Sequence, residues 1–202
     1  MAFAFPCARW MCFLSALRRR SRSWFRFRGT RPREGLRVSR ANLKSVSTKT
    51  FTTPEEYLRT SFEGLDREYA DGEIVERNGG EQPHSKIQAR LVEIVYELRK
   101  AKPVYALPEL RLKLSETRYR IPDVSIFAGQ GPAENVPSRP PLIAVEIVSR
   151  DDRYTKIVEK LDEYHAWGVP HISLADPRQR KLSNYGPEGL TAVSLLHVPN
   201  WV

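Results

Sequence analysis

Two carboxylates stand inside apolar stretches of strand length near the middle of the chain. Asp123 belongs to the stretch 121–127, Glu146 belongs to the stretch 142–148, and Lys160 follows in a charged segment soon afterwards. An isolated carboxylate is costly to bury, so each acid must be ion-paired, bound to a metal or protonated. Two such acids on neighbouring strands, with a lysine close behind, predict a functional site.

Two carboxylates and a lysine in this arrangement suit the metal-assisted hydrolysis of a phosphodiester. Hard divalent cations prefer carboxylate and carbonyl oxygens, which Asp123, Glu146 and the main-chain carbonyl of Ile147 would supply. Such a cation lowers the pKa of a bound water and neutralises charge that grows on a phosphoryl oxygen. The ammonium of Lys160 would add a compact positive charge that orients the nucleophile. We therefore predict Mg²⁺ or Mn²⁺ as the cofactor.

Residue chemistry alone leaves a plainer interpretation open. Asp123 and Glu146 would then be ion-paired acids of a core, with Arg120 or Arg150 as partners. Lys160 would be an ordinary lysine on the flank of a helix, with its stem packed and its ammonium in water. The residue types favour neither interpretation, so the order of the motifs has to decide between them.

The positive charge of the chain lies at its N-terminal end. The formal net charge is +9, but residues 1–45 carry twelve of the 33 Lys and Arg residues and a single acid, Glu34, which leaves the rest at −2. The basic composition is therefore no argument that the folded part binds nucleic acid. We interpret residues 1–45 as a basic leader, either disordered or translated upstream of the natural start, with an organelle transit peptide as the alternative.

Residues 46–202 are predicted to form one domain. Both cysteines, Cys7 and Cys12, precede it, so it can contain no disulfide and no thiolate metal site. This fits a reducing compartment, and we expect the cytoplasm. The chain has no uncharged apolar run of eighteen or more residues, so we expect no association with a membrane.

The elements that must position the acids follow from periodicity and turn signals. Thr53-Pro54 begins a helix, Asp71-Gly72 turns a hairpin, and apolar residues at helical spacing predict a helix over 84–100. A second amphipathic helix is predicted over 152–167, ended by Gly168. Strands are predicted over 104–107, 109–114, 121–127, 142–148 and 171–175, and as a final hairpin of 181–185 with 190–196.

This order predicts an α/β or α+β fold with a mixed central sheet flanked by helices. The stretch 142–148 is apolar on both faces apart from Glu146, which is typical of a central strand covered on both sides. No glycine-rich phosphate loop follows any predicted strand, so nucleotide-dependent chemistry has no support.

In this order and spacing the motifs resemble the restriction-endonuclease-like superfamily, PD-(D/E)xK, and within it the Uma-two-type endonucleases. The resemblance covers 53–185, and its matching pieces are Arg67-Glu68-Tyr69-Ala70-Asp71-Gly72-Glu73, His84, Ile121-Pro122-Asp123-Val124, Val145-Glu146-Ile147-Val148-Ser149, Glu159-Lys160-Leu161 with Tyr164, Gly168-Val169-Pro170 and Ala175-Asp176-Pro177. The chain departs from the signature at Val148, where the superfamily has lysine. In relatives of this type the lysine lies on the following helix, which points to Lys160. Helical geometry supports Lys160 over Lys156, because Lys160 precedes Leu161 and borders the apolar stripe, while Lys156 points further towards solvent.

The resemblance implies a magnesium-dependent endodeoxyribonuclease with Asp123, Glu146 and Lys160 as catalytic residues. It also implies Glu68 as an outer acid that helps to hold the metal or its water, and His84 as a contact to substrate phosphate. Many members act as dimers, which allows a homodimer here, although no sequence feature indicates one. The rival hypotheses are a catalytically inactive module of the same fold that binds nucleic acid or a partner, and a structural domain with ion-paired acids.

Overall fold

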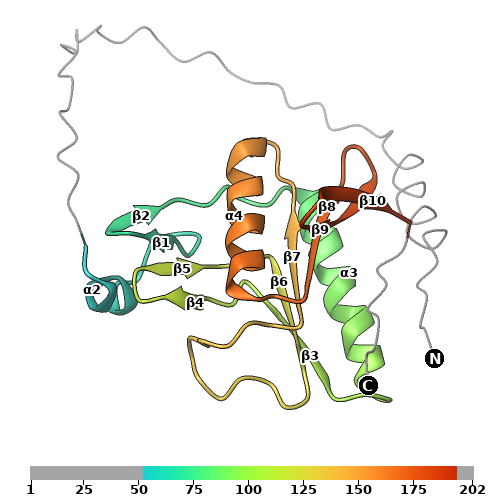
Figure 1. The fold of residues 1–202 in the computed structure, drawn as a ribbon, viewed down its shortest axis with the longest axis horizontal. Helices are drawn as coiled ribbons and strands as arrows, with labels where there is room; N and C mark the ends of the chain where they lie inside the picture. The colour runs from blue at the N-terminus through green and yellow to red at the C-terminus, as the bar shows by residue number, and fades with distance from the viewer. Residues whose placement is uncertain (1–51, 195–202) are drawn as a thin grey trace, which may run out of the picture.

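The computed structural model describes residues 52–194, which fold around two β-sheets (Figure 1). The larger sheet consists of β3 (Val104–Pro108), β6 (Val124–Ala128), β7 (Ile143–Ile147), β8 (His171–Asp176), β9 (Lys181–Gly186) and β10 (Gly189–Val193). Its strand order is β10-β9-β8-β7-β6-β3, with β7 and β8 parallel and the other neighbours antiparallel. The prediction of a mixed central sheet is confirmed.

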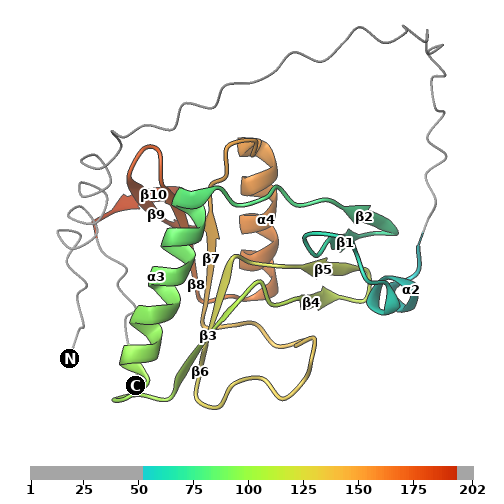
Figure 2. The same ribbon diagram turned by 180° about the vertical axis from the view of Figure 1, so that it is seen from behind.

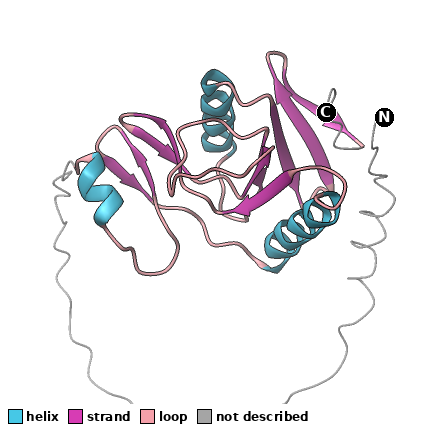
Figure 3. Ribbon diagram, turned by 90° about the horizontal axis from the view of Figure 1, so that it is seen from below, coloured by secondary structure: helices cyan, strands magenta, loops and turns pink. Residues whose placement is uncertain are grey.

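The smaller sheet is antiparallel and stands beside the larger one (Figure 3). It consists of β1 (Glu68–Ala70), β2 (Glu73–Val75), β4 (Leu112–Ser115) and β5 (Arg118–Arg120), in the order β2-β1-β5-β4. The hairpin of β1 and β2 is the one predicted from Asp71-Gly72, and both turn residues have positive φ angles, 49° and 92°. An Asp-Gly pair tolerates this conformation, which a two-residue hairpin turn requires.

Two long helices cover opposite faces of the larger sheet (Figures 1 and 2). The helix α3 (Gln82–Leu98) packs Ile87, Leu91 and Val95 against one face. The helix α4 (Tyr154–Trp167) packs Leu161 and Tyr164 against the other, and Gly168 ends it in the left-handed conformation that a C-cap glycine adopts readily. Both helices therefore agree with the predicted ones, although α3 begins two residues earlier. The short helix α2 (Pro54–Arg59) has the predicted Thr53 cap, completed by Glu56.

The predicted strand 121–127 is wrong at its beginning. The strand β6 starts only at Val124, and the segment 121–123 carries the chain from the smaller sheet to the larger one. Pro122 explains part of the difference, because proline has no N–H to donate to a strand neighbour. The residues just before this segment, 118–120, form a separate strand of the smaller sheet that the sequence did not reveal. Asp123 therefore lies at the junction of the two sheets.

Two predicted segments lie partly or wholly beyond residues 52–194. The predicted leader, residues 1–45, and the end of the predicted last strand, residues 195 and 196, lie outside the described residues. Between residues 52 and 194, none of the helices has the length and apolar character needed to cross a membrane.

Candidate active site

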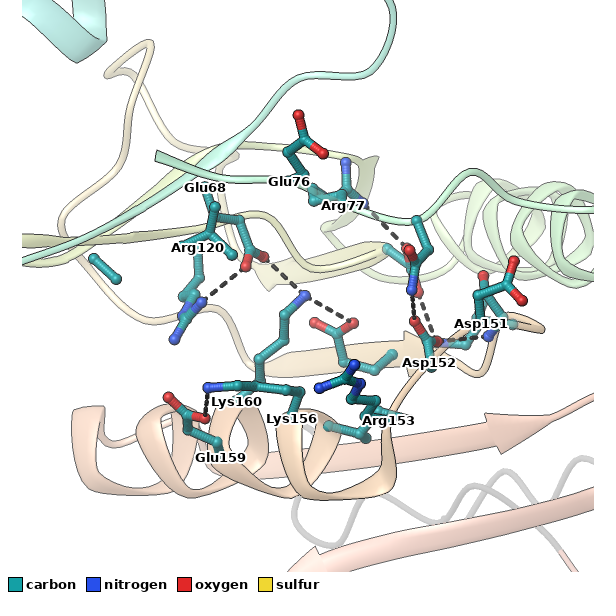
Figure 4. Close-up of a pocket in the computed structure, with 18 of the residues that line it drawn as sticks. Glu68, Glu76, Arg77, Arg120, Asp151, Asp152, Arg153, Lys156, Glu159 and Lys160 are labelled. Atoms are coloured by element: carbon teal, nitrogen blue, oxygen red, sulfur yellow. Dashed lines mark hydrogen bonds and ion pairs between the residues drawn. The ribbon is translucent and has the colours of Figure 1, made fainter. Parts of the chain in front are cut away.

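A cleft of about 740 Å³ lies where the two sheets and α4 meet. Its walls come from β1, β2, β5 and β7, from one side of α4 and from the segments that follow β2 and β7. All five residues predicted for the site line it: Glu68, His84, Asp123, Glu146 and Lys160. Figure 4 shows how side chains from the smaller sheet and from α4 point into the cleft from opposite sides. Residues far apart in the sequence thus share one charged cavity.

Asp123 is buried and held by hydrogen bonds from two directions. Its Oδ2 accepts a hydrogen bond from the main-chain N–H of Ile147 at 2.7 Å, and Nε2 of His84 lies 3.2 Å from the same oxygen. Its Oδ1 accepts a hydrogen bond from Nη2 of Arg77 at 3.2 Å. These contacts fix the orientation of the carboxylate beside β7.

Glu146 reaches the cleft from the buried central strand β7. The register that pairs Val124 with Val145 brings Glu146 next to Asp123. The hydroxyl of Tyr164, on α4, donates a hydrogen bond to Oε1 of Glu146 at 2.7 Å. Burial raises the pKa of Glu146 to about 7, and the negative charges of Asp123 and Glu68 add to the effect against the opposing influence of Lys160.

Lys160 lies between two carboxylates of the cleft. Its Nζ is 2.8 Å from Oε1 of Glu68 and 3.7 Å from Oε2 of Glu146. Burial disfavours the ammonium, but Glu146 and Glu68 outweigh this and raise the pKa of Lys160, so the side chain stays charged. The side chain of Lys160 is 20% exposed, whereas that of Lys156, one turn earlier on α4, is 71% exposed and pairs with Glu159. Both lysines line the cleft, but only Lys160 reaches the two buried carboxylates.

Glu68 is fully buried and binds two cations of the cleft, Lys160 and Arg120. Besides Lys160, its carboxylate accepts hydrogen bonds from Nη1 of Arg120 at 2.9 Å and from the main-chain N–H of Ile121 at 3.2 Å. Arg120 in turn donates two hydrogen bonds to Glu163 on α4, at 2.6 and 2.8 Å. Burial works against the charge of Glu68, but Lys160 and Arg120 lower its pKa. This network joins β1, β5 and α4.

His84 lies near the N-terminus of α3 and faces Asp123. Burial opposes its protonation, but the hydrogen bond and the charge of Asp123 raise the pKa of His84. Its Nδ1 is buried without a hydrogen-bond partner in the described residues, and a side chain at position 80 would lie 2.7 Å from that atom. Gly80 thus allows the ring to sit close against the main chain.

Sequence reasoning missed three residues of this site: Arg77, Tyr164 and Glu163. Arg77 stands in a polar loop with no periodic signal, and Tyr164 reads as a core residue of an amphipathic helix. The partners suggested for the acids were also wrong. Asp123 is paired with Arg77 rather than Arg120, and Arg150 lies 4.0 Å from Glu81. A helical projection of α4 places Tyr164 one turn beyond Lys160, which was the available signal for a shared face.

The donor set fits a hard divalent cation. Over residues 52–194 no group of three or more His, Cys, Asp or Glu side chains is arranged to hold a metal ion. Magnesium, however, is commonly held by one or two carboxylates, with water and substrate phosphates completing its shell. Nine acidic and six basic side chains line the cleft, and the pKa of Glu146 is raised chiefly by burial and further by the charges of Asp123 and Glu68. A dication beside Asp123 and Glu146 would offset the negative charge of these acids.

The raised pKa of Glu146 predicts how stability depends on pH in the metal-free protein. Folded Glu146 keeps its proton from its ordinary pKa of 4.5 up to about 7, a range in which the unfolded carboxyl has lost it. The free energy of unfolding should therefore fall as the pH rises through this range. Urea unfolding in EDTA at about pH 5 and about pH 7.5 should show a smaller fall for Glu146→Gln. An equal fall in both proteins would contradict the assignment.

The mixed sheet, the two covering helices and the cleft between the sheets define the restriction-endonuclease-like class of proteins. The chain belongs to the Uma2 family, described as "Putative restriction endonuclease", whose model matches residues 54–200. It is also similar to the crystal structure of "a putative nuclease belonging to DUF820 from Anabaena variabilis ATCC 29413". The TM-score is 0.62 at 23% identity, over 71% of this chain and 84% of that chain. No curated protein matches the chain.

The family comparison confirms the resemblance that the motifs gave. Membership of this family implies a nuclease that acts on nucleic acid, and the restriction-endonuclease-like proteins generally use divalent metals. The structural similarity independently supports the fold.

Proposed function

We propose that this protein is a divalent-metal-dependent endonuclease that hydrolyses phosphodiester bonds of DNA. The observation that carries the proposal is the meeting of Asp123, Glu146 and Lys160 in one cleft, from the sheet junction, the central strand and α4. Two neighbouring buried carboxylates in a cleft, one of them with a raised pKa, are typical of a functional site. Family membership supports the same chemistry. We further propose that residues 46–202 constitute the catalytic domain.

Asp123 and Glu146, with the carbonyl of Ile147, would hold Mg²⁺ or Mn²⁺, which supplies an activated water and neutralises phosphoryl charge when bound. The protein fixes these ligands before the substrate arrives. The N–H of Ile147 orients Asp123, and the hydroxyl of Tyr164 orients Glu146. Lys160 stays charged and directs its ammonium at the same space, where it stabilises negative charge on the phosphate.

Glu68 and His84 support this centre. The role of Glu68 as an outer holder of the metal or its water remains a prediction. Because its two oxygens already accept hydrogen bonds from Lys160, Arg120 and Ile121, we propose that it acts chiefly by fixing Lys160. The role of His84 in contacting phosphate also remains a prediction, which its contact with Asp123 at 3.2 Å supports.

The decisive experiment compares metal binding and cleavage in the same samples of the full chain. Mg²⁺ and Mn²⁺ are titrated by calorimetry into wild type and into Asp123→Ala/Glu146→Ala, and each sample is incubated with double-stranded DNA, single-stranded DNA and RNA. We expect the double variant to lose both binding and cleavage. A control that removes two acids outside the cleft, Glu93→Ala/Glu97→Ala, should keep both, because these side chains are 62% and 60% exposed on α3.

Two results would contradict the proposal in different ways. Metal binding without cleavage of any nucleic acid would favour an inactive binding module of the same fold, in line with Val148 at the position of the signature lysine. Absence of metal binding in wild type would favour a structural role for the buried acids. Cleavage of RNA but not DNA would show that the proposed substrate is wrong, while the proposed metal-dependent hydrolysis would be retained.

A further inference from the structure

A buried arginine sits on the free side of the carboxylate of Asp123. Arg77 follows β2 and extends into the cleft, with a side chain that is 8% exposed. Its Nη2 lies 3.2 Å from Oδ1 of Asp123, and its Nη1 lies 3.7 Å from Oε2 of Glu109. Nη1 is buried and makes no hydrogen bond with any described residue. The guanidinium is thus held chiefly by charge, with Asp123 as its nearer partner.

The two oxygens of Asp123 are not equivalent. Oδ2 is engaged by the N–H of Ile147 and by His84, which orient the carboxylate. Oδ1 is the oxygen that Arg77 contacts. A cation that binds Asp123 from the cleft must therefore share this carboxylate with a permanent positive charge. Guanidinium does not lose its proton in proteins, so Arg77 cannot relieve the conflict by becoming neutral.

We propose that Arg77 is the resident counter-ion of Asp123 and sets how tightly the cleft binds a divalent cation. The inference rests on the proposed function, since it takes Asp123 to be a metal ligand. Without a metal, Arg77 stabilises a buried carboxylate whose Oδ1 would otherwise lack a charged partner, since His84 and the N–H of Ile147 contact only Oδ2. When a dication binds, the two cations repel each other across a poorly solvated space, which weakens the binding of the metal. Arg77 acts through Asp123 and is a positioning residue.

Calorimetric titration of Mn²⁺ into the full chain tests this inference. We expect Arg77→Gln to bind Mn²⁺ about ten-fold more tightly than wild type, within the usual range of coupling between two charges at one site. Arg77→Lys keeps the charge and should lie near wild type. Arg153→Gln removes an exposed arginine from the mouth of the same cleft and should change the affinity by less than about three-fold. A merely structural role of Arg77 predicts weaker binding instead.

A second measurement needs no variant. Nuclear magnetic resonance of the guanidinium groups in wild type, during a titration with Mg²⁺, should show the Arg77 signal move as the metal loads. The signal of Arg120 should stay in place, because two hydrogen bonds to Glu163 and one to Glu68 hold that group. A fixed Arg77 signal at metal saturation would overturn the inference.

The failures of the two proposals can be told apart. If wild type binds Mn²⁺ and Asp123→Ala does not, but Arg77→Gln binds no more tightly than wild type, only the inference about Arg77 is wrong. If neither wild type nor Arg77→Gln binds Mn²⁺, the metal site itself is wrong and the inference is overturned with it.

Discussion

Replacing Lys160 by methionine should reduce nuclease turnover by about 10²–10³-fold, the usual cost of removing one preorganised charge from the reacting phosphate. Methionine keeps most of the packed stem and removes only the ammonium, which lies 2.8 Å from Glu68 and 3.7 Å from Glu146. Cleavage of DNA at saturating Mg²⁺ measures the effect. The measured loss reports turnover, because at saturating Mg²⁺ a change in metal affinity does not limit the rate of cleavage.

The matched control lies one turn earlier on the same helix. Lys156→Met removes the same charge from α4, but this side chain is 71% exposed and pairs with Glu159 at the rim of the cleft. Its nuclease turnover should stay within about three-fold of wild type, as expected of a solvent-screened charge. If Lys156→Met and Lys160→Met reduced turnover equally, the activity would depend on the total positive charge of α4 and not on the position of Lys160.

The pH profile provides a further check on Lys160. Its positive charge opposes the rise in the pKa of Glu146, so its removal should raise that pKa beyond about 7. Glu146 must be deprotonated to serve as the proposed metal ligand. As the pH is lowered, the activity that remains should therefore be lost at a higher pH than in wild type. A profile that is lower at every pH but unshifted would contradict the coupling between Lys160 and Glu146.

The central strand and its acid could be predicted because they obey local rules. A stretch that is apolar on both faces predicts a covered strand, and a carboxylate inside it needs a partner, so Glu146 stood out. Lys160 could be preferred over Lys156 because it borders the apolar stripe of an amphipathic helix, and its burial in the structure agrees with that choice. The strand and the preference between the two lysines came from the pattern within one element, whereas the search for a lysine on this helix came from the family resemblance.

The remaining parts of the site depend on contacts between elements. Glu68 precedes an Asp-Gly turn, a position that is usually exposed, yet it is fully buried, with β1 paired to β5 and Lys160 of α4 in contact with its carboxylate. The separate sheet to which it belongs is not visible in the local pattern, since its strands have only three or four residues. Arg77 is a loop residue whose importance comes only from its distance to Asp123. The periodicity of the sequence within one element does not reveal contacts of this kind between elements.

One half of the cleft consists of buried charges that are held by ion pairs. Glu68, Arg120 and Glu163 form a closed network in which each charge has a partner. Asp123 and Glu146 also have cationic neighbours, Arg77 and Lys160, but the two acids stand beside each other and burial raises the pKa of Glu146. We therefore infer that the network of Glu68 serves stability and the position of Lys160, and that Asp123 and Glu146 are the acids that a divalent cation would contact.

This division predicts that Arg120→Met destabilises the fold strongly, by about 3–5 kcal/mol, as is typical when one partner of a buried pair is removed. Arg120 is 4% exposed and makes three hydrogen bonds to Glu68 and Glu163. Without it, Glu68 keeps its charge in the protein interior with only Lys160 and the N–H of Ile121 as donors. Urea unfolding measures the loss of free energy.

Two further variants test whether the loss of stability in Arg120→Met comes from leaving Glu68 as a buried charge without its arginine partner. Arg118→Met removes a neighbouring arginine that is 25% exposed and pairs with Asp71 and Glu163, and it should cost no more than about 1 kcal/mol. Glu68→Gln combined with Arg120→Met removes both charges, so it should be more stable than Arg120→Met alone. If the double variant were instead less stable than either single variant, Glu68 would not depend on Arg120 for its charge. The anchoring of Lys160 would then require another explanation.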